Sequence, residues 1–267
     1  MRIVDHSVFK KVKKFFSDYG FPQDSKIVLA LSGGMDSMCL FYVLRELKKQ
    51  GLIHSLRVVH FNHKIREESD EEERALKSYL DEINVAYKVF ALELFSGASN
   101  LEQKAREVRY EKLRQEINND EFCFFGHHLN DHFEWSLMRL FRSGEDDILS
   151  GMPRVRDRFA RPLSYVHRNE ISDFVEMFDV TYWQDCSNFN SQFDRNHLRN
   201  EIVPLIEKRY PNYLEHFFHR QNIALKKKYE CEHYIVTRNS KFSMVFCLDK
   251  FSKGMFECIT DLIKCHS

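Results

Sequence analysis

The residues Lys26-Ile27-Val28-Leu29-Ala30-Leu31-Ser32-Gly33-Gly34-Met35-Asp36-Ser37 decide the fold of this chain. The apolar, β-branched run at their start is typical of a buried strand, and it leads into a turn of small residues and then into a helix. Glycine lets the backbone approach a ligand closely, and a helix that begins near Asp36 would point free N–H groups at the same place. The stretch predicts a phosphate-binding loop, although a tight strand-to-helix turn alone would also use two glycines.

The polar side chains of this loop favour nucleotide chemistry. Asp36 supplies a carboxylate that a metal ion can bridge to phosphate, and Ser32 and Ser37 supply hydroxyl donors. The loop lacks the lysine of a Walker loop and the third glycine of a dinucleotide fingerprint. Its Ser-Gly-Gly-x-Asp-Ser pattern resembles the signature of the ATP pyrophosphatase superfamily, whose members cleave ATP between the α and β phosphates and adenylate a substrate.

Length and composition indicate a globular protein with one large domain and a small appendage. The 267 residues are 43% hydrophobic and 14% aromatic, which is ample for a buried core. A formal net charge of +0 removes a global attraction to nucleic acid, so any polyanion site must be a local patch. The seven cysteines include no Cys-x-x-Cys pair, and no apolar run approaches the roughly 20 residues of a membrane span. We therefore expect reduced thiols and a cytoplasmic location.

Strand and helix patterns alternate along the first half of the chain. After the strand that begins at Lys26, strands are predicted at 55–61, 85–92 and 121–125, and helices at 38–47, from 67 with Ser69 as N-cap, at 101–117 and at 131–141. This alternation predicts an α/β fold with a doubly wound, mainly parallel sheet. Residues 143–157 are predicted to form a mobile loop over the site. We expect a catalytic domain at 1–212 and a short, mostly helical region at 213–267.

Three polar segments follow predicted strands, at 32–37, 62–66 and 126–131. Ligands gather beyond the carboxyl ends of the strands in such sheets, so these segments should converge on one crevice. Asp131 could serve only as a helix N-cap, but its expected proximity to Asp36 predicts a second oxygen directed at magnesium. These two aspartates are predicted to position the metal that neutralises charge on departing pyrophosphate.

Further polar clusters leave alternatives open. The turn that contains His63 is either a solvated basic loop or a contact to the nucleotide, and zinc binding by histidines has no cysteine pair to support it. Arginine matches phosphate geometry, yet charged runs are usually only solvated surface. The segment 185–204 fits a structural helix start and a catalytic role about equally well.

Taken together, these segments resemble the bacterial tRNA(Ile)-lysidine synthetase family. The resemblance covers about residues 24–206, and it rests on residues 32–37, 62–66 with 68–70, 102–110, 127–134, 140–144, 161–163 and 185–188, followed by Arg195, Asn196 and Arg199. It implies an adenine nucleotide alpha hydrolase-like fold. It also implies that ATP adenylates the wobble cytidine of a tRNA(Ile) with a CAU anticodon, and that the amine of free L-lysine then displaces AMP.

The resemblance also implies roles for single residues. Ser32, Gly33, Gly34, Asp36 and Ser37 would hold ATP, with His63, Arg106 and Arg109 also near the nucleotide; Asp36 and Asp131 would hold Mg²⁺; Arg199 would lie near the adenylate, base or tRNA; and Glu134 would orient lysine. The chain departs from the family pattern at Asn130, where an aspartate is common, so Asn130 is given no metal role. It also has Trp135 where threonine is common.

Other functions remain open at this stage. The alternatives are a tRNA-thiolating enzyme with the same loop, and a catalytically inactive RNA-binding relative. A thiolating enzyme would usually need a cysteine pair or an activated thiol. The region after residue 211 is short beside the tRNA-gripping domains of many relatives, and the protein could also act as a homodimer.

Overall fold

The computed structural model describes residues 1–62, 68–92, 101–143, 148, 151–183 and 194–232. The chain forms two compact units, the first made of Met1–His132 with Arg154–Asn190 and the second of Phe133–Pro153 with Ser191–Ser267. The two units are defined by how the chain packs, and they do not test the domain boundary expected between residues 212 and 213. That boundary stays a prediction.

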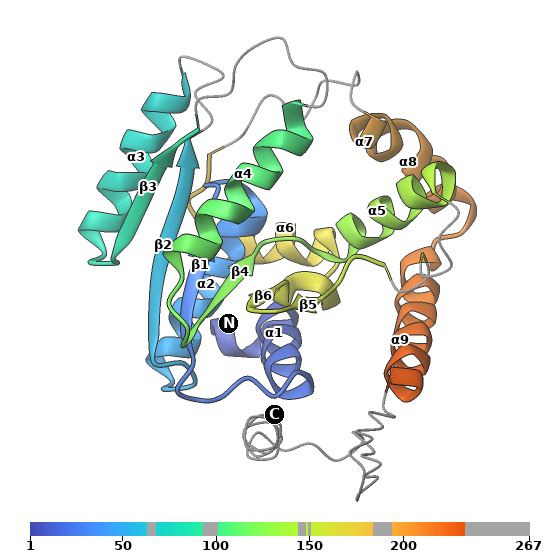
Figure 1. Cartoon of the computed structure of the whole chain (residues 1–267), viewed down its shortest axis with the longest axis horizontal. Helices are drawn as coiled ribbons and strands as arrows, with labels where there is room; N and C mark the ends of the chain where they lie inside the picture. The colour runs from blue at the N-terminus through green and yellow to red at the C-terminus, as the bar shows by residue number, and fades with distance from the viewer. Residues whose placement is uncertain (63–67, 93–100, 144–147, 149–150, 184–193, 233–267) are drawn as a thin grey trace, which may run out of the picture. The chain divides into compact units, whose positions relative to one another are not determined.

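One sheet organises the first unit (Figure 1). Its strands are β1 (Lys26–Ala30), β2 (Ser55–Asn62), β3 (Tyr87–Ala91), β4 (Glu121–Phe125), β5 (Val155–Arg156) and β6 (Phe159–Ala160). They lie in the order β3-β2-β1-β4-β6-β5, and all neighbours are parallel except the β5–β6 pair. The predicted α/β fold with a mainly parallel sheet is confirmed. The prediction of a mobile loop at 143–157 is wrong for the end of that range. Val155 and Arg156 form β5 of the sheet, and Arg154 is buried.

The helices of the first unit are α1 (Ser7–Asp18), α2 (Met35–Lys49), α3 (Glu68–Glu82), α4 (Leu101–Glu116) and α6 (Arg168–Met177), together with the first residues of α5 (Leu129–Arg142). Short 3-10 turns lie at Ile3–Asp5 and Pro162–Tyr165. Ser69 is the second residue of α3 and not the N-cap that the sequence predicts. Helix α1 is not among the predicted helices, although the helical spacing of buried Val8, Val12 and Phe16 fits one.

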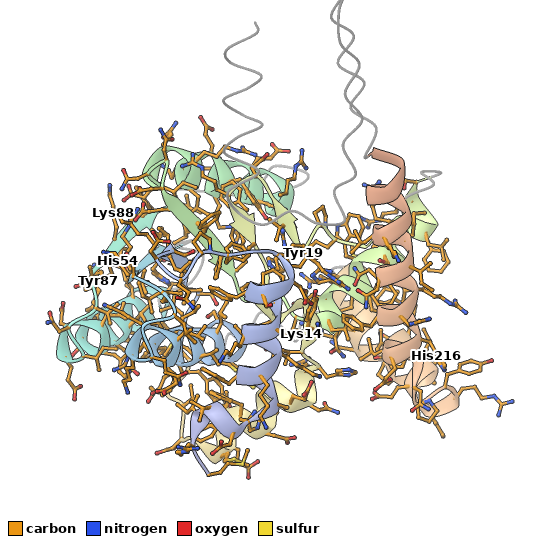
Figure 2. All side chains as sticks on the ribbon, turned by 90° about the horizontal axis from the view of Figure 1, so that it is seen from below. Lys14, Tyr19, His54, Tyr87, Lys88 and His216 are labelled. Carbon is orange, nitrogen blue, oxygen red and sulfur yellow. The ribbon has the colours of Figure 1, made fainter. Side chains whose placement is uncertain are left out.

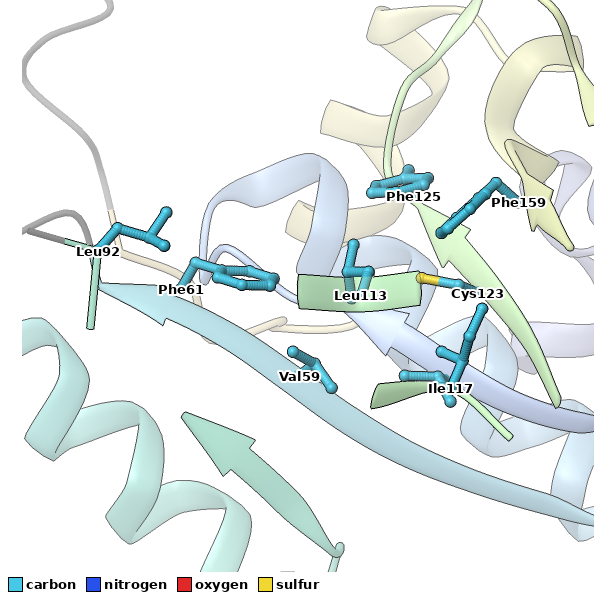
Figure 3. Close-up of a cluster of buried hydrophobic side chains, with 9 residues drawn as sticks. Val59, Phe61, Leu92, Leu113, Ile117, Cys123, Phe125 and Phe159 are labelled. Atoms are coloured by element: carbon cyan, nitrogen blue, oxygen red, sulfur yellow. The ribbon is translucent and has the colours of Figure 1, made fainter. Parts of the chain in front are cut away.

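Helices cover both faces of this sheet, as the doubly wound prediction requires. On one face, Leu113 and Ile117, from α4 and the turn after it, pack against Val59 and Cys123 (Figure 3). On the other face, the ring of Phe16 in α1 lies 5.4 Å from the ring of Phe124 in β4. Successive residues of a strand point to opposite faces, so one strand supplies both packing layers. The near-continuous apolar strands follow from this two-sided burial.

An ion-pair network ties the sheet together near the start of β4. The guanidinium of Arg57 in β2 donates to both carboxylate oxygens of Glu121, at 2.7 Å each, and to Glu116 at the end of α4, at 3.0 Å. Lys88 of the edge strand β3, labelled in Figure 2, reaches the same Glu116 at 2.6 Å. The hydrogen bond from Arg57 holds the pKa of the Glu121 carboxyl below its usual value.

The second unit is helical in the part that the structure describes. Helix α5 continues into it, followed by α7 (Asp194–His197), a π-helical turn (Leu198–Ile202), α8 (Val203–Arg209) and α9 (Tyr213–Glu232). The ring of Phe133 on α5 packs against the rings of Tyr213, at 4.7 Å, and Phe217, at 5.3 Å. The helical character expected after residue 212 is therefore confirmed for α9, and residues 233–267 lie outside the described residues.

None of the helices in the described ranges combines the length and the apolar character that crossing a bilayer requires.

Replacing Glu121 by glutamine should lower the free energy of unfolding by about 1–3 kcal/mol, because Arg57 loses its charged acceptor on a buried side chain. The carboxyl has a lowered pKa in the folded state, so its stabilisation is present above the ordinary glutamate value of 4.5 and is lost as pH falls through the lowered pKa. Denaturant titrations at pH 7 and below 4 measure this difference. Glu71→Gln, in an exposed ion pair, is the matched control and should change stability by less than about 0.5 kcal/mol.

Candidate functional site

The turn after β1 forms a compact cradle. Gly33 has φ +89°, a conformation that L side chains rarely adopt. Ser37 donates its hydroxyl proton to the carbonyl oxygen of Gly34 at 2.9 Å, so Ser32 must donate in its own 2.9 Å contact with Ser37. Gly34 is the N-cap of α2 and provides no side-chain cap. The first turn of α2 therefore keeps its backbone donors directed at a place where an anion can bind.

A second glycine brings β4 close to this cradle. A Cβ atom on Gly126 would lie 3.0 Å from both the Cα and the backbone nitrogen of Ser37, which is tighter than nine in ten real Cβ contacts. Strands β1 and β4 are neighbours, yet the chain reaches β4 only after adding β2 and β3 on the other side of β1. The cradle therefore lies at the point where the strand order reverses, which is where open α/β sheets bind ligands.

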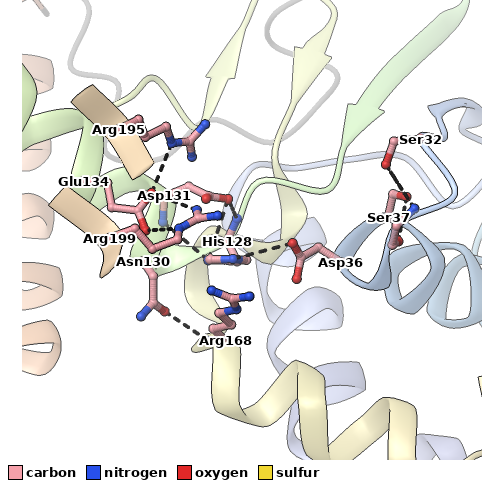
Figure 4. A network of polar contacts seen from close by, with 11 residues as sticks. Ser32, Asp36, Ser37, His128, Asn130, Asp131, Glu134, Arg168, Arg195 and Arg199 are labelled. Carbon is pink, nitrogen blue, oxygen red and sulfur yellow. Dashed lines mark hydrogen bonds and ion pairs between the residues drawn. The ribbon is translucent and has the colours of Figure 1, made fainter. Parts of the chain in front are cut away.

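The imidazole of His128 lies between the two aspartates that the sequence singles out (Figure 4). Its Nε2 is 3.7 Å from Oδ2 of Asp36, and its Nδ1 is 3.7 Å from Oδ2 of Asp131. The backbone N–H of Asp131 donates to Nδ1 at 3.4 Å, and Nε2 faces Asp36. The side chain of Asp36 is 37% exposed and that of Asp131 is 8% exposed, which leaves Asp36 the more accessible carboxylate.

Asp131 also has a structural role that the sequence left open. Helix α5 begins at Leu129, so His128 is its N-cap and Asp131 is its third residue. The Asp131 carboxylate accepts the backbone N–H of His128 at 2.9 Å while the His128 ring accepts the backbone N–H of Asp131, a reciprocal capping box. Asp131 is thus part of the cap without being the N-cap residue itself.

The neighbours of Asp131 on α5 are also engaged. The side-chain oxygen of Asn130 accepts the backbone N–H of Arg168 at 3.0 Å, at the start of α6. An aspartate would accept the same bond, so the departure from the family pattern is compatible with this helix contact. His132 is fully buried, and burial, followed by the nearby charges of Arg154 and Arg161, holds its pKa well below the usual value. His132 is therefore neutral at pH 7.

His60 and Trp183 hold the backbone of the cradle. The sequence suggested His60 only as a possible zinc ligand and did not single out Trp183. The buried ring of His60 in β2 contacts the carbonyl oxygen of Leu31 at 2.8 Å through Nδ1, and burial lowers the pKa of this histidine. The backbone N–H of Trp183 donates to the carbonyl oxygen of Gly33 at 3.0 Å. Nothing in sequence spacing points to a contact across 150 residues.

Arg106 and Arg109, the arginines predicted near the nucleotide, lie on α4 in the first unit. The guanidinium of Arg106 lies 5.5 Å from the centre of the Tyr110 ring, and the hydroxyl of that tyrosine accepts from buried Arg161 at 2.7 Å. The Tyr110 ring lies 5.3 Å from the ring of Phe125, the last residue of β4, so this part of α4 lies at the carboxyl edge of the sheet. Arg106 and Arg109 are thereby brought to the same edge of the sheet as the cradle.

Glu134, Arg195 and Arg199 form a cluster in the second unit (Figure 4). Arg199 donates to both carboxylate oxygens of Glu134, at 2.7 and 2.8 Å, and Arg195 donates at 3.1 Å. The Glu134 side chain is only 3% exposed. Arg199 belongs to the π-helical turn before Pro204, whose missing N–H cannot bond the carbonyl of Asn200. Such turns are frequent at functional sites.

His63 and the proposed magnesium ligands are the predicted contacts that remain. His63 lies outside the described residues, so its role stays a prediction. Asn62, just before it, is buried and donates to Asp70 at 2.8 Å and Glu73 at 2.7 Å, which ties β2 to α3. Among the residues that the structure describes, no three or more His, Cys, Asp or Glu side chains form a metal-binding group. A pair of carboxylates beside a phosphate cradle still fits Mg²⁺, which takes one or two carboxylates together with substrate phosphates.

Comparison with known proteins gives consistent results. The model of the PP-loop domain family matches residues 4–206. A tRNA(Ile)-lysidine synthase of Petrotoga mobilis is 30% identical over 234 residues, which cover 83% of this chain and 75% of that protein. A tRNA(Ile)-lysidine synthase of Streptococcus sanguinis is 35% identical over 207 residues, 75% of this chain and 45% of that protein. The chain thus spans less than half of some relatives that it matches.

A solved structure shares the fold. The U34-tRNA thiolase NcsA of Methanococcus maripaludis aligns over 95% of this chain and 86% of its own, with a TM-score of 0.64 and 18% sequence identity. At this identity the likeness shows the fold alone.

Replacing Gly126 by alanine should weaken ATP binding at least tenfold, because the added methyl group must displace the backbone at the start of α2. Isothermal titration calorimetry with ATP and magnesium measures the change. Gly51→Ala is the matched control, since Gly51 has φ +69° and nothing within 4 Å of an added Cβ. That control should cost about 1 kcal/mol of stability and leave ATP affinity unchanged. Equal ATP affinities in the two variants would contradict the close packing of β4 against the cradle.

Proposed function

The chain belongs to the PP-loop domain family and, within it, to the tRNA(Ile)-lysidine synthetases, and on this premise we propose that it is an ATP-dependent ligase. It joins free L-lysine to C2 of the wobble cytidine in a tRNA(Ile) with a CAU anticodon, and it releases AMP and pyrophosphate. One observation carries the proposal. Helix α2 begins after Gly34 without a side-chain cap, and this start lies where the strand order of the sheet reverses, between β1 and β4. We expect the enzyme to act in the cytoplasm, where its substrates meet.

The first step is adenylation of the base. The O2 atom of cytidine attacks the α phosphorus of ATP, and the bond from that phosphorus to the bridging oxygen of pyrophosphate breaks. In the proposed arrangement, Ser32, Ser37 and the backbone N–H groups from Gly34 onward bind the phosphate oxygens. Each hydroxyl has a single proton, so Ser32 and Ser37 must turn it from their present contacts to a phosphate oxygen. The backbone N–H groups are fixed by the helix and need little reorganisation as charge develops on pyrophosphate.

Asp36 and Asp131 are the residues that would hold Mg²⁺ in this proposal. A magnesium ion, when bound, would neutralise charge on the departing pyrophosphate. Nε2 of His128 lies 3.7 Å from the Asp36 carboxylate, and the capping box holds the Asp131 carboxylate in place. Arg106 and Arg109, at the same edge of the sheet, are proposed to meet the nucleotide or the RNA backbone, because guanidinium groups match phosphate oxygens.

The second step is attack by lysine. The lysine amine bonds to C2, the C2–O2 bond breaks, AMP departs with that oxygen, and the amine loses a proton. Glu134 is our candidate for orienting the lysine. A carboxylate has about four acceptor positions, and three of those on Glu134 are taken by Arg195 and Arg199, so one further N–H donor can be accepted. The two guanidinium groups hold the carboxylate in place for that contact.

Thiolation of tRNA would use the same cradle, but the described cysteines do not suit it. Cys39 and Cys123 are both buried, and burial raises the pKa of each thiol, which makes the nucleophilic thiolate scarce. The sequence also has no Cys-x-x-Cys pair. A catalytically inactive RNA-binding protein would have no need for the accessible carboxylate of Asp36 beside the cradle. The ligase is therefore the better-supported proposal.

Asp36→Ala should abolish pyrophosphate release, measured with ATP, magnesium, labelled lysine and a tRNA(Ile) transcript with a CAU anticodon. Wild-type protein should incorporate label into the RNA and release AMP. Asp5→Asn, an exposed acidic residue outside the site, serves as the control and should keep full activity. Sulfur incorporation without lysine incorporation by the wild type would instead establish thiolation. If the wild type turned over neither donor, a catalytically inactive RNA-binding protein would be the remaining alternative.

Glu134→Gln should separate the two steps. Pyrophosphate release should stay within about threefold of the wild type, while transfer of lysine to the adenylated RNA should fall at least 100-fold, because a neutral amide binds the lysine ammonium group weakly. Single-turnover assays with isolated adenylated RNA measure the second step directly. Glu201→Gln, an exposed glutamate paired with His197, is the matched control. Equal loss in both steps would show that Glu134 supports the fold or the adenylation instead.

A further inference from the structure

Trp183 contacts the phosphate cradle in two ways, and both contacts fall on Gly33. Its backbone N–H donates to the carbonyl oxygen of Gly33 at 3.0 Å. Its ring lies beside the same residue, since a Cβ on Gly33 would be 3.3 Å from Cε3 of the indole. Both residues belong to the first unit, where Trp183 follows α6 and is only half-buried.

The carbonyl contact fixes the direction of the next N–H group. A trans peptide is planar, and its carbonyl and N–H point in opposite directions. When the Gly33 carbonyl is held toward Trp183, the N–H of Gly34 must point to the other side of the loop. There it meets Ser32 Oγ at 3.3 Å, the longest hydrogen bond within the cradle. This N–H can exchange that weak partner for a phosphate oxygen.

A Gly-Gly peptide needs such a restraint. Glycine adopts positive and negative φ about equally, so the peptide between Gly33 and Gly34 could rotate and direct its carbonyl at the phosphate, which would repel it. The indole of Trp183 occupies the space beside Gly33. The ring is itself supported by Tyr79 of α3, in an edge-on contact at 6.4 Å, and the Tyr79 hydroxyl donates to that of Tyr42 on α2 at 2.9 Å.

We propose that Trp183 is a positioning residue for the nucleotide: it holds the Gly33–Gly34 peptide with its N–H facing the ATP phosphates. The inference rests on the proposed function, because it assigns a role in the same ATP site. Trp183 touches the loop and not the reacting atoms. Its loss should therefore raise the KM for ATP and leave the KM for lysine unchanged.

Fluorescence gives a readout that a purely structural role would not move. The chain has two tryptophans, Trp135 and Trp183, so Trp135→Phe leaves Trp183 as the single emitter. Addition of ATP and magnesium to this variant should shift or quench the emission in a saturable way. The concentration dependence should match the Kd for ATP from calorimetry. Unchanged emission on saturation with ATP would overturn the contact between the indole and a ligand-responsive loop.

Three substitutions separate the ring from the backbone donor. Trp183→Phe keeps the N–H and an aromatic ring and should bind ATP within threefold of the wild type. Trp183→Ala keeps only the N–H and should bind about tenfold more weakly. Trp183→Pro removes the N–H as well and should bind at least 50-fold more weakly. Circular dichroism and thermal melting verify folding, and if the proline variant does not fold, the alanine variant and the emission measurement decide the outcome.

The outcomes also separate this inference from the function on which it rests. If the wild type does not bind ATP, both the proposed function and the inference are overturned. If the wild type binds ATP and folded Trp183→Ala and Trp183→Pro bind equally well, the role of Trp183 is overturned and the proposed function stands.

Discussion

The parallel pairing of β1 with both β2 and β4 is the constraint on which the structure depends. Because these strands run in one direction, their carboxyl ends meet at one edge, and the glycine turn after β1 lies beside Gly126 after β4. Burial on both faces of the sheet holds β1 in the centre, where it cannot slide without moving the turn. The geometry of the candidate ATP site is therefore set by the core beneath it.

The starts of the helices around this edge differ in a way that bears on function. Histidine is the N-cap residue of α1, α5 and α6, and in each case its side chain or its backbone N–H takes part in a local cap. Helix α2 begins instead at Gly34, which has no side chain to offer. Backbone donors at a helix start need partners, and at α2 the natural partner is an anion. The capped helices supply rigidity, and the capless helix supplies the binding site.

Much of the fold could be predicted because local chemistry fixes it. The apolar runs and the helical spacings gave four strands and most helices nearly at their observed bounds, since burial periodicity is written directly in the sequence. Two-residue strands such as β5 and β6 carry no such periodicity, so the hairpin at 155–160 was missed. The N-cap prediction for Ser69 failed because residue type alone does not fix the first residue of a helix, and α3 already includes Glu68.

The sequence by itself determined which chemistry this protein carries: a glycine turn, two aspartates and a set of arginines in a recognisable order. Only the tertiary structure decided how they are held, with His128 between Asp36 and Asp131, Glu134 between Arg195 and Arg199, and Trp183 on Gly33. The physical reason is that residue types and spacings record local preferences of the backbone. Contacts between residues far apart along the chain form only when the packed core brings their elements together.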